Sequence, residues 1–205
     1  IMFRLFMYLE TTSDFVYYMK TRSSTFQESV SDIDSEEWRL EAFVDADYAG
    51  DVRTRKSTTG YILVVRGPGG CCFAIDWASV TQKVVCLSTA EAEYRALLEG
   101  GRRALAAAGV PEFLLQKELP LYVRSDASTT IHIVKSGRSK RMSYMRKSVD
   151  VTLKWTQETF GDRLHKVDTY FNLSDTFTKP LPEEDFVRHR DWMGMAAFGA
   201  IFGGQ

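Results

Sequence analysis

The stretch Phe43–Gly50 constrains the fold of this chain most strongly, because it combines the pattern of a buried strand with two carboxylates. Side chains alternate between the two faces of a strand, so Phe43, Asp45 and Asp47 share one face and small or apolar residues occupy the other. A carboxylate is rarely buried unless it is paired or binds a metal ion. The stretch therefore predicts either a strand that carries a metal site or an edge strand whose aspartates are solvated or cap the following turn.

The composition is that of a globular protein and limits the partners of the chain. Of its 205 residues, 44% are hydrophobic and 26% are charged. The net charge of −1 provides no overall positive field, so any contact with nucleic acid has to be local. The three cysteines lack C-x-x-C spacing, which argues against a disulfide framework and a zinc site and fits a reducing compartment. No apolar run approaches the roughly 20 residues that span a bilayer. We therefore expect no membrane partner and no small-molecule cofactor.

The order of the predicted elements indicates an α/β domain. Antiparallel strands are expected first, and strands that alternate with helices follow, which is typical of a mixed sheet with helices packed on it. Residues 20–37 are polar and lack apolar periodicity, so we divide the chain into a leading segment with a linker (1–37), a domain (38–195) and a disordered tail (196–205). The strands are predicted at 15–18, 40–47, 59–65, 71–77, 83–87, 119–125 and 163–167, and the helices at 89–108, 127–134, 148–160 and 173–179.

A third candidate carboxylate, Glu93, lies in the helix predicted over 89–108. Ser88 and Glu91 have the spacing of a capping box, which gives Glu91 a structural role at the helix start. Glu93 instead shares a stripe with small and apolar residues that should face the sheet: Ala96, Leu97, Gly100, Gly101, Ala104 and Leu105. A strand aspartate that shares a cation with Glu93 would satisfy it. The alternative is a first-turn glutamate that stays half in water.

Two further aspartates lie at the ends of predicted elements. Asp126 follows the strand at 119–125, at the edge where open sheets bind ligands, although aspartate is also a common N-cap. Asp175 lies in the first turn of the helix at 173–179, where the helix dipole favours a carboxylate. These positions by themselves leave open whether the two residues form a site or stabilise helices.

Taken together, the motifs resemble the ribonuclease H domain of copia-type LTR retrotransposon Pol polyproteins. They follow one another in the order of that family and cover about residues 40–195. Residues 7–18 (MYLETTSDFVYY) are similar to the end of the family's reverse transcriptase, which assigns 1–37 to the end of that domain and a linker. The motifs are FVDADYAGD (43–51), KSTTGY (56–61), LSTAEAEYRAL (87–97), SDASTTI (125–131) and NLSDTFTKPL (172–181).

The resemblance implies an α/β fold of the ribonuclease H-like type, with a five-stranded mixed sheet of strand order 3-2-1-4-5 and helices on both faces. It also implies a metal-dependent endonuclease that cuts the RNA strand of RNA–DNA hybrids during reverse transcription. The catalytic and metal-binding residues carried over by position are Asp45, Glu93, Asp126 and Asp175. Two Mg²⁺ ions, for which Mn²⁺ could substitute, would promote phosphodiester hydrolysis from oxygen ligands. Asp45 is expected to bridge the ions, with Glu93 and Asp126 on one ion and Asp175 on the other.

The implied partners are an RNA–DNA hybrid and the reverse transcriptase domain of the same polyprotein, in a cytoplasmic virus-like particle or in the nucleus. No acid occurs between Asp126 and Asp150, and this basic stretch is a candidate for phosphate contacts. A solvated loop is the alternative interpretation. The candidate nucleic-acid-binding residues are Lys135, Arg138, Lys140, Arg141, Arg146 and Lys147.

The sequence departs from the family pattern at a few positions. Ala127 stands where the family usually has Asn, and Ser148 where it has His. Residues 168–173 contain no His, which many ribonucleases H carry before the last acid, and we interpret His132 and His189 as surface residues. The alternative function is therefore a catalytically decayed remnant that acts, if at all, as a nucleic-acid-binding or scaffold module. Another nuclease or an integrase of the same superfamily would need a different spacing of acids.

Overall fold

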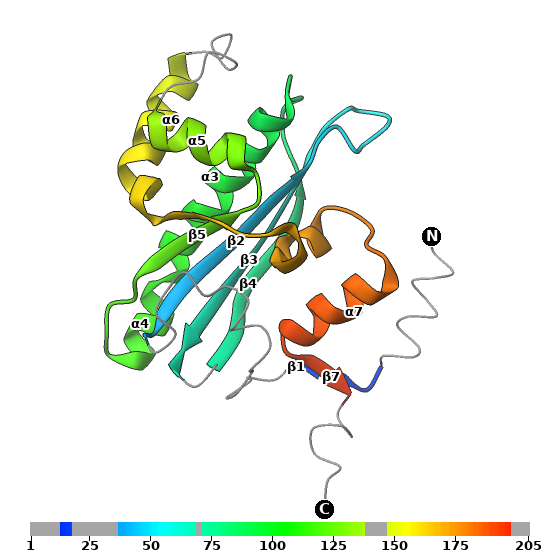
Figure 1. The fold of residues 1–205 in the computed structure, drawn as a ribbon, viewed down its shortest axis with the longest axis vertical. Helices are drawn as coiled ribbons and strands as arrows, with labels where there is room; N and C mark the ends of the chain where they lie inside the picture. Colours follow the sequence, from blue (N-terminus) through cyan, green and yellow to red (C-terminus); the bar gives the residue numbers. More distant parts are fainter. Residues whose placement is uncertain (1–12, 18–36, 69–70, 138–146, 198–205) are drawn as a thin grey trace, which may run out of the picture.

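The computed structural model describes residues 13–17, 37–68, 71–137 and 147–197 (Figure 1). Most of the leading segment, including residues 20–36 of the linker predicted over 20–37, lies outside these ranges. The strands are β1 (Phe15–Tyr17), β2 (Arg39–Asp47), β3 (Thr58–Gly67), β4 (Cys71–Thr81), β5 (Leu121–Ser125), β6 (Leu164–Lys166) and β7 (Met195–Ala197). The α-helices are α3 (Thr89–Ala107), α4 (Gly109–Leu115), α5 (Ser128–Ser136), α6 (Lys147–Phe160) and α7 (Glu183–Trp192). Short 3-10 segments are η3 (Gly161–Arg163), η4 (Thr169–Phe171) and η5 (Leu173–Phe177).

The main sheet has five strands in the order β4-β3-β2-β5-β6. Counted along the chain within this sheet, the order is 3-2-1-4-5, as predicted for the ribonuclease H-like fold. The β2–β3 and β3–β4 pairs are antiparallel, whereas β2–β5 and β5–β6 are parallel. The hairpin strands at the start and the helix-connected strands that follow therefore join at β2, the central strand that carries Asp45.

Two hydrophobic cores lie on opposite faces of this sheet, which confirms the prediction of helices on both sides (Figure 1). On one face Val44 of β2 packs with Leu97 of α3 and Val134 of α5. On the other face Phe43 packs with Leu173 of η5 and with the partly buried Trp192 of α7. The alternation of β2 side chains read from the sequence thus determines which helices lie on which face.

Helix α3 begins as its capping pattern predicts and packs closely on the sheet. The Ser88 hydroxyl accepts a hydrogen bond from the Glu91 N–H at 3.2 Å. A Cβ atom at Gly100 would lie 2.4 Å from Cγ1 of Val44, so glycine allows the helix backbone to approach β2. The predicted sheet-facing stripe is buried up to Ala104, but Leu105 is 39% exposed. The apolar stripe of α3 therefore turns away from the sheet near the end of the helix.

Several predicted elements differ from the structure. The strand predicted at 83–87 is a connection in which Val84, Val85 and Leu87 are exposed, because β4 extends to Thr81 and takes the edge position. The helix predicted at 173–179 is the shorter 3-10 segment η5. Helices α4 and α7 were not predicted, and the first turn of α7 is acidic with little apolar periodicity. Ala196 and Ala197, expected in the tail, belong to β7, which pairs with β1.

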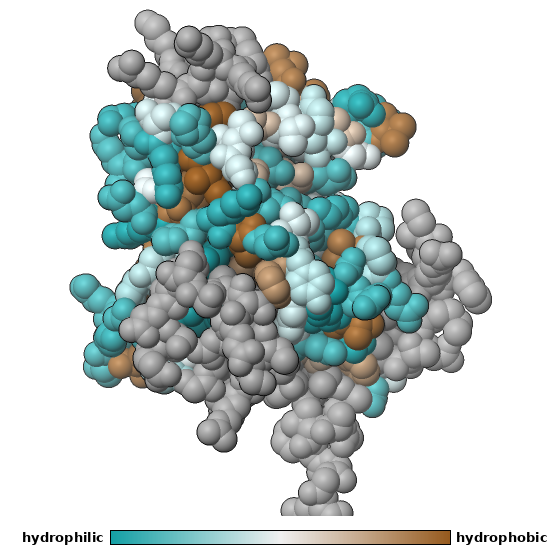
Figure 2. All heavy atoms as spheres, in the orientation of Figure 1, coloured by the Kyte–Doolittle hydropathy of each residue, from teal (hydrophilic) through white to brown (hydrophobic). Residues whose placement is uncertain are grey.

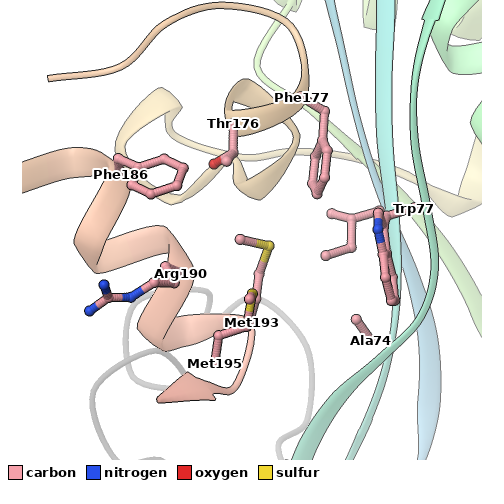
Figure 3. Close-up of a pocket in the computed structure, with 9 residues that line it drawn as sticks. Ala74, Trp77, Thr176, Phe177, Phe186, Arg190, Met193 and Met195 are labelled. Carbon is pink, nitrogen blue, oxygen red and sulfur yellow. The ribbon is translucent and has the colours of Figure 1, made fainter. Parts of the chain in front are cut away.

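An apolar pocket of about 310 Å³ lies between the outer strands and the C-terminal helix (Figure 3). It is lined by residues that include Trp77 of β4, Phe177 of η5 and Phe186 of α7, and none of its described lining residues carries a carboxylate. On the face seen in Figure 2, exposed apolar side chains form small separate groups among polar ones. Among the described residues, no helix is both long and apolar enough to cross a membrane.

Candidate metal centre

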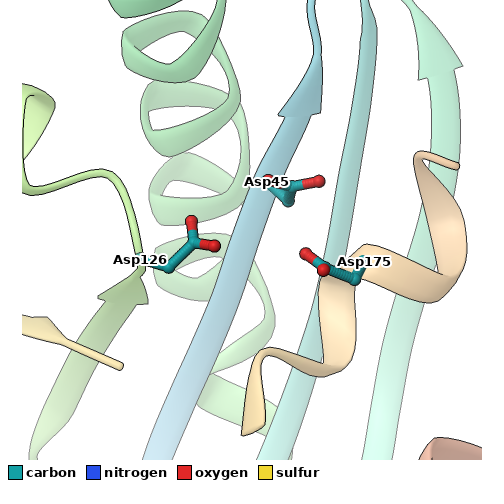
Figure 4. A group of neighbouring side chains, drawn as sticks. All are labelled: Asp45, Asp126 and Asp175. Atoms are coloured by element: carbon teal, nitrogen blue, oxygen red, sulfur yellow. The ribbon is translucent and has the colours of Figure 1, made fainter. Parts of the chain in front are cut away.

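Three of the four predicted acids converge at one end of the central strands (Figure 4). Asp45 comes from β2, Asp126 follows β5 directly, and Asp175 belongs to η5. Each offers one carboxylate oxygen, and these oxygens all lie within 4.8 Å of one another. Asp126 follows Asp45 by 81 positions in the sequence, and Asp175 follows Asp126 by 49. The strand order of the sheet brings these distant residues together.

Glycine at position 60 allows η5 to lie close enough for this convergence. Gly60 is the direct β3 partner of Asp45. A Cβ atom there would lie 2.8 Å from the Ser174 carbonyl oxygen and 2.6 Å from Cγ2 of Thr178, both closer than real Cβ contacts. The Asn172 side chain also donates to the Val44 carbonyl at 3.4 Å and accepts from the Ser174 hydroxyl at 2.6 Å. The segment that carries Asp175 is therefore fixed against β2 and β3.

Glu93 lies beside these three aspartates, although outside the group of oxygens within 4.8 Å. It is 8% exposed and lines a cavity of about 600 Å³ together with Asp45 and Asp126. Its Oε2 atom is buried without a hydrogen-bond partner. Burial, followed by the charges of Asp45, Asp126 and Asp175, raises the pKa of Glu93 to about 9. Of the two interpretations of Glu93, the structure supports the buried carboxylate near a strand aspartate.

Burial and mutual repulsion also raise the pKa values of Asp45 and Asp175, the other two buried acids of this group. The pKa of Asp45 is raised chiefly by burial, against the opposing effects of the Thr178 hydroxyl and the Lys179 charge. The pKa of Asp175 is raised to about 7 by burial and by the charge of Asp45, although Lys179 opposes this shift. The carboxylates are thus held in a place where their charged forms need further cations.

Three side chains that sequence reasoning missed contact the aspartates. The Thr178 hydroxyl donates to Oδ2 of Asp45, and the Thr169 hydroxyl donates to Oδ2 of Asp126 at 2.8 Å. Nζ of Lys179 lies 2.8 Å from Oδ2 of Asp175. Thr178 and Lys179 are three and four residues after Asp175 in one turn of chain, and that spacing was the available signal.

The donor set fits divalent metal ions. Every candidate ligand is a carboxylate oxygen, the type that Mg²⁺ prefers. Two buried oxygens, Oε2 of Glu93 and Oδ1 of Asp175, have no hydrogen-bond partner, which is costly unless something else satisfies them. Divalent cations would supply this partner and offset the repulsion among the acids.

The predicted basic stretch is only partly described. Lys135 is exposed in the last turn of α5, and Lys147 begins α6, whereas Arg138, Lys140, Arg141 and Arg146 lie outside the described residues.

Among the histidines, His132 is exposed as predicted, but the surface interpretation of His189 is wrong. His189 is 2% exposed and connects α7 to the Thr176 hydroxyl and the Tyr170 carbonyl, at 3.0 and 3.1 Å.

Comparison with known proteins shows that the sequence is similar to polyproteins of mobile elements. The chain is 36% identical over 165 residues to the retrovirus-related Pol polyprotein from transposon TNT 1-94 of Nicotiana tabacum, a match over 76% of this chain and 11% of that polyprotein. The chain is homologous to a segment of retrovirus-related Pol polyproteins. The Pol polyprotein from transposon RE2 of Arabidopsis thaliana is 29% identical over 168 residues, which cover 80% of this chain and 11% of the relative. The recognition of a retrotransposon Pol sequence is thus confirmed, and the chain spans about a tenth of the length of these relatives.

Other comparisons add the following findings. No protein-family model matches the sequence. The crystal structure of RNase H1 from the halophilic archaeon Halobacterium salinarum NRC-1 aligns with 73% of this chain and 98% of its own chain, with 19% sequence identity and a TM-score of 0.42.

Proposed function

We propose that this Pol segment is a ribonuclease H that hydrolyses the RNA strand of RNA–DNA hybrids during reverse transcription. The observation that carries the proposal is the convergence of oxygens from Asp45, Asp126 and Asp175 within 4.8 Å, with the buried Glu93 beside them. Its support from relatives is that the matched proteins are Pol polyproteins of transposons.

The proposed roles follow from the chemistry of the four acids. Asp45, Glu93, Asp126 and Asp175 would hold two Mg²⁺ ions, with Asp45 shared, Glu93 and Asp126 on one ion and Asp175 on the other. Bound in pairs, such ions activate a water and stabilise the charge that develops on the phosphate and on the leaving oxygen. The Thr178 and Thr169 hydroxyls would hold the carboxylates of Asp45 and Asp126 in position for the ions.

The proposed substrate explains the basic stretch between Asp126 and Asp150. Lys135 in α5 and Lys147 at the start of α6 flank residues 138–146, which hold the other four basic candidates. Contacts to phosphates, without reading of base edges, suit an enzyme that recognises the shape of a hybrid. The proposal includes residues 38–195 as the nuclease domain, the reverse transcriptase of the same polyprotein as its partner, and a cytoplasmic virus-like particle or the nucleus as its location.

Hydrolysis of a labelled RNA–DNA hybrid in Mg²⁺ tests the proposal. Asp45→Asn should lower the rate at least about 100-fold, because a neutral amide is a poor ligand for Mg²⁺ at the centre of the site. Asp47→Asn is the matched control, since Asp47 is on the same face of β2 but outside the carboxylate group, and it should keep its rate within about threefold. Undiminished cutting by Asp45→Asn would refute the assignment.

The alternative function is a remnant that binds hybrids without cutting them. Ala127, the N-cap residue of α5, favours this alternative, because the family usually has Asn at this position and alanine brings no polar side chain next to Asp126. A chain that binds a hybrid in a gel-shift experiment but leaves its RNA intact in Mg²⁺ and in Mn²⁺ would establish the alternative.

A further inference from the structure

Lys179 is placed so that it could compete with metal ions for the acid cluster. Its Nζ atom lies 2.8 Å from Oδ2 of Asp175. It is also the one basic side chain among the described residues that line the cavity with Asp45, Glu93 and Asp126. The cluster therefore contains a positive charge that belongs to the chain itself.

The backbone after η5 delivers this charge to the site. The Lys179 N–H donates to the Asp175 carbonyl at 3.2 Å, which closes one turn and brings both side chains to the same side. Pro180 follows and cannot donate a further backbone hydrogen bond. The Lys179 side chain remains 41% exposed, so its long stem can carry the ammonium group out to water without disturbing the turn.

The three aspartates therefore differ in the charge of the side chains that contact them. Asp45 and Asp126 accept hydrogen bonds from the neutral hydroxyls of Thr178 and Thr169, whereas Asp175 is paired with a cation. A divalent ion on Asp175 would lie within a few ångströms of the ammonium group and would be repelled by it. The repulsion would be relieved only if the lysine left the carboxylate.

We propose that the ammonium group of Lys179 is a tethered cation that holds the Asp175 side of the site when metal is absent, and that a divalent ion binds there only by displacing it. This inference rests on the proposed function, because it concerns the same four acids. Lys179 then sets the concentration of free Mg²⁺ that is needed to fill the weaker of the two ion sites.

Binding of Mn²⁺ to the full chain tests the inference without hydrolysis. Free Mn²⁺ is counted by electron paramagnetic resonance during titration of wild type, Lys179→Gln and Lys179→Arg. Lys179→Gln should bind the weaker ion about tenfold more tightly, because a positive charge near a divalent ion has been removed. Lys179→Arg keeps the charge, can pair with the carboxylate through two hydrogen bonds, and should bind the weaker ion no more tightly than wild type. Lys117→Gln is the matched control, because it removes an ion-paired, half-exposed lysine that pairs with Glu37 and lies outside this cavity.

The shift in melting temperature caused by Mg²⁺ gives a second readout. It should be larger for Lys179→Gln than for wild type, since the variant lacks a cation before the metal binds. Equal or weaker Mn²⁺ binding by Lys179→Gln would overturn the inference while leaving the metal site itself intact. If wild type and Asp45→Asn both fail to bind Mn²⁺, or bind it equally, the proposed function fails instead. A Lys179→Gln chain that folds only in Mg²⁺, judged by circular dichroism, would support the inference.

Discussion

Buried acids lie on the same face of strand β2 near both of its ends, but the charges that surround them have opposite signs. Glu41 is fully buried, and its oxygens lie 2.7 Å from Nε of Arg39 and 3.3 Å from nitrogens of Arg66 and Arg124. Four residues further on, Asp45 lies among three other acids, and within the described part of the chain Lys179 is the one basic side chain that lines their cavity. In the first cluster the fold supplies more positive than negative charge, and in the second most of the negative charge has to be balanced by cations from outside.

The pKa values follow the same contrast. Burial alone would raise the pKa of Glu41, but the charges of Arg66, Arg124 and Arg39 outweigh it and lower the pKa to about 2. For Glu93 the charges of Asp45, Asp126 and Asp175 act in the same direction as burial, and the Lys179 charge opposes them without preventing the rise in pKa. Buried charge stabilises a fold only where its partners are built in, and a carboxylate cluster without such partners indicates a binding function.

The largest expected effect is a difference in the free energy of unfolding between variants of the two clusters. Glu41→Gln removes the carboxylate that three buried guanidinium groups share, and should lower the free energy of unfolding by about 3–5 kcal/mol. Glu93→Gln replaces a buried carboxyl group that holds its proton in the fold with a neutral amide, and it should leave stability in EDTA unchanged or higher. Urea unfolding of both variants in EDTA measures the difference. Equal losses would show that the two ends of β2 are not electrostatically distinct.

The pH dependence of stability should have opposite signs at the two ends. The pKa of Glu41 is about 2 in the fold against 4.5 unfolded, so its contribution, about 3 kcal/mol, is present above pH 4.5 and lost as the pH falls toward 2. The pKa of Glu93 is about 9, so the folded state holds a proton there that the unfolded state releases above 4.5. Stability in EDTA should therefore fall as the pH rises from about 4.5 to about 9.

Mg²⁺ distinguishes these two pH effects in one experiment. The loss on the alkaline side should diminish when Mg²⁺ is added, because the ions stabilise the charged acids. The loss on the acidic side should remain unchanged. Urea midpoints from pH 2 to 9 with EDTA and with Mg²⁺ provide the measurement, and an alkaline loss that Mg²⁺ does not reduce would contradict the metal site.

Gly60→Ala should damage the acid site with a smaller cost to the fold. The new Cβ atom would force η5 away from β3, at about 1–3 kcal/mol, and would move Asp175 away from Asp45. The increase in melting temperature caused by Mg²⁺ should then be largely lost. Gly109→Ala is the control, because a Cβ atom there meets nothing within 4 Å. If Gly60→Ala keeps its response to Mg²⁺, close packing of η5 is not what positions the site.

The smallest expected effect concerns the Thr178 hydroxyl. Thr178→Val removes the donor to Asp45 and should weaken Mg²⁺ binding about tenfold, as loss of a group that orients a metal ligand typically does. Thr178→Ser keeps the hydroxyl and should restore most of the affinity. Calorimetric titration with Mg²⁺ compares the two, and equal affinities would remove Thr178 from the site.

Local patterns explain what could be predicted from the sequence. The Ser88 cap, the alternation along β2 and the sequence of hairpin strands before helix-connected strands each depend on neighbouring residues, and they predicted a mixed sheet with helices packed on it. The strand order itself was implied by the resemblance of the motifs to a known family, and the structure has that order. The four acids were also named from short motifs. Helix α7 was not predicted, because its apolar residues are too few to form a clear stripe, and His189 is buried through contacts that no local pattern reveals.

Periodicities in the sequence by themselves determined a mixed sheet with helices packed on it, because they involve only neighbouring residues. The order of the strands and the identity of the candidate acids came from short motifs that resemble those of a known family. Only the tertiary structure decided which acids receive compensating charge. The Thr178 hydroxyl reaches Asp45 across 133 residues of sequence, and Arg124 reaches Glu41 across 83. Such contacts depend on how closely η5 and β5 pack on β2, and this distance is set by the whole core and by the space left at Gly60.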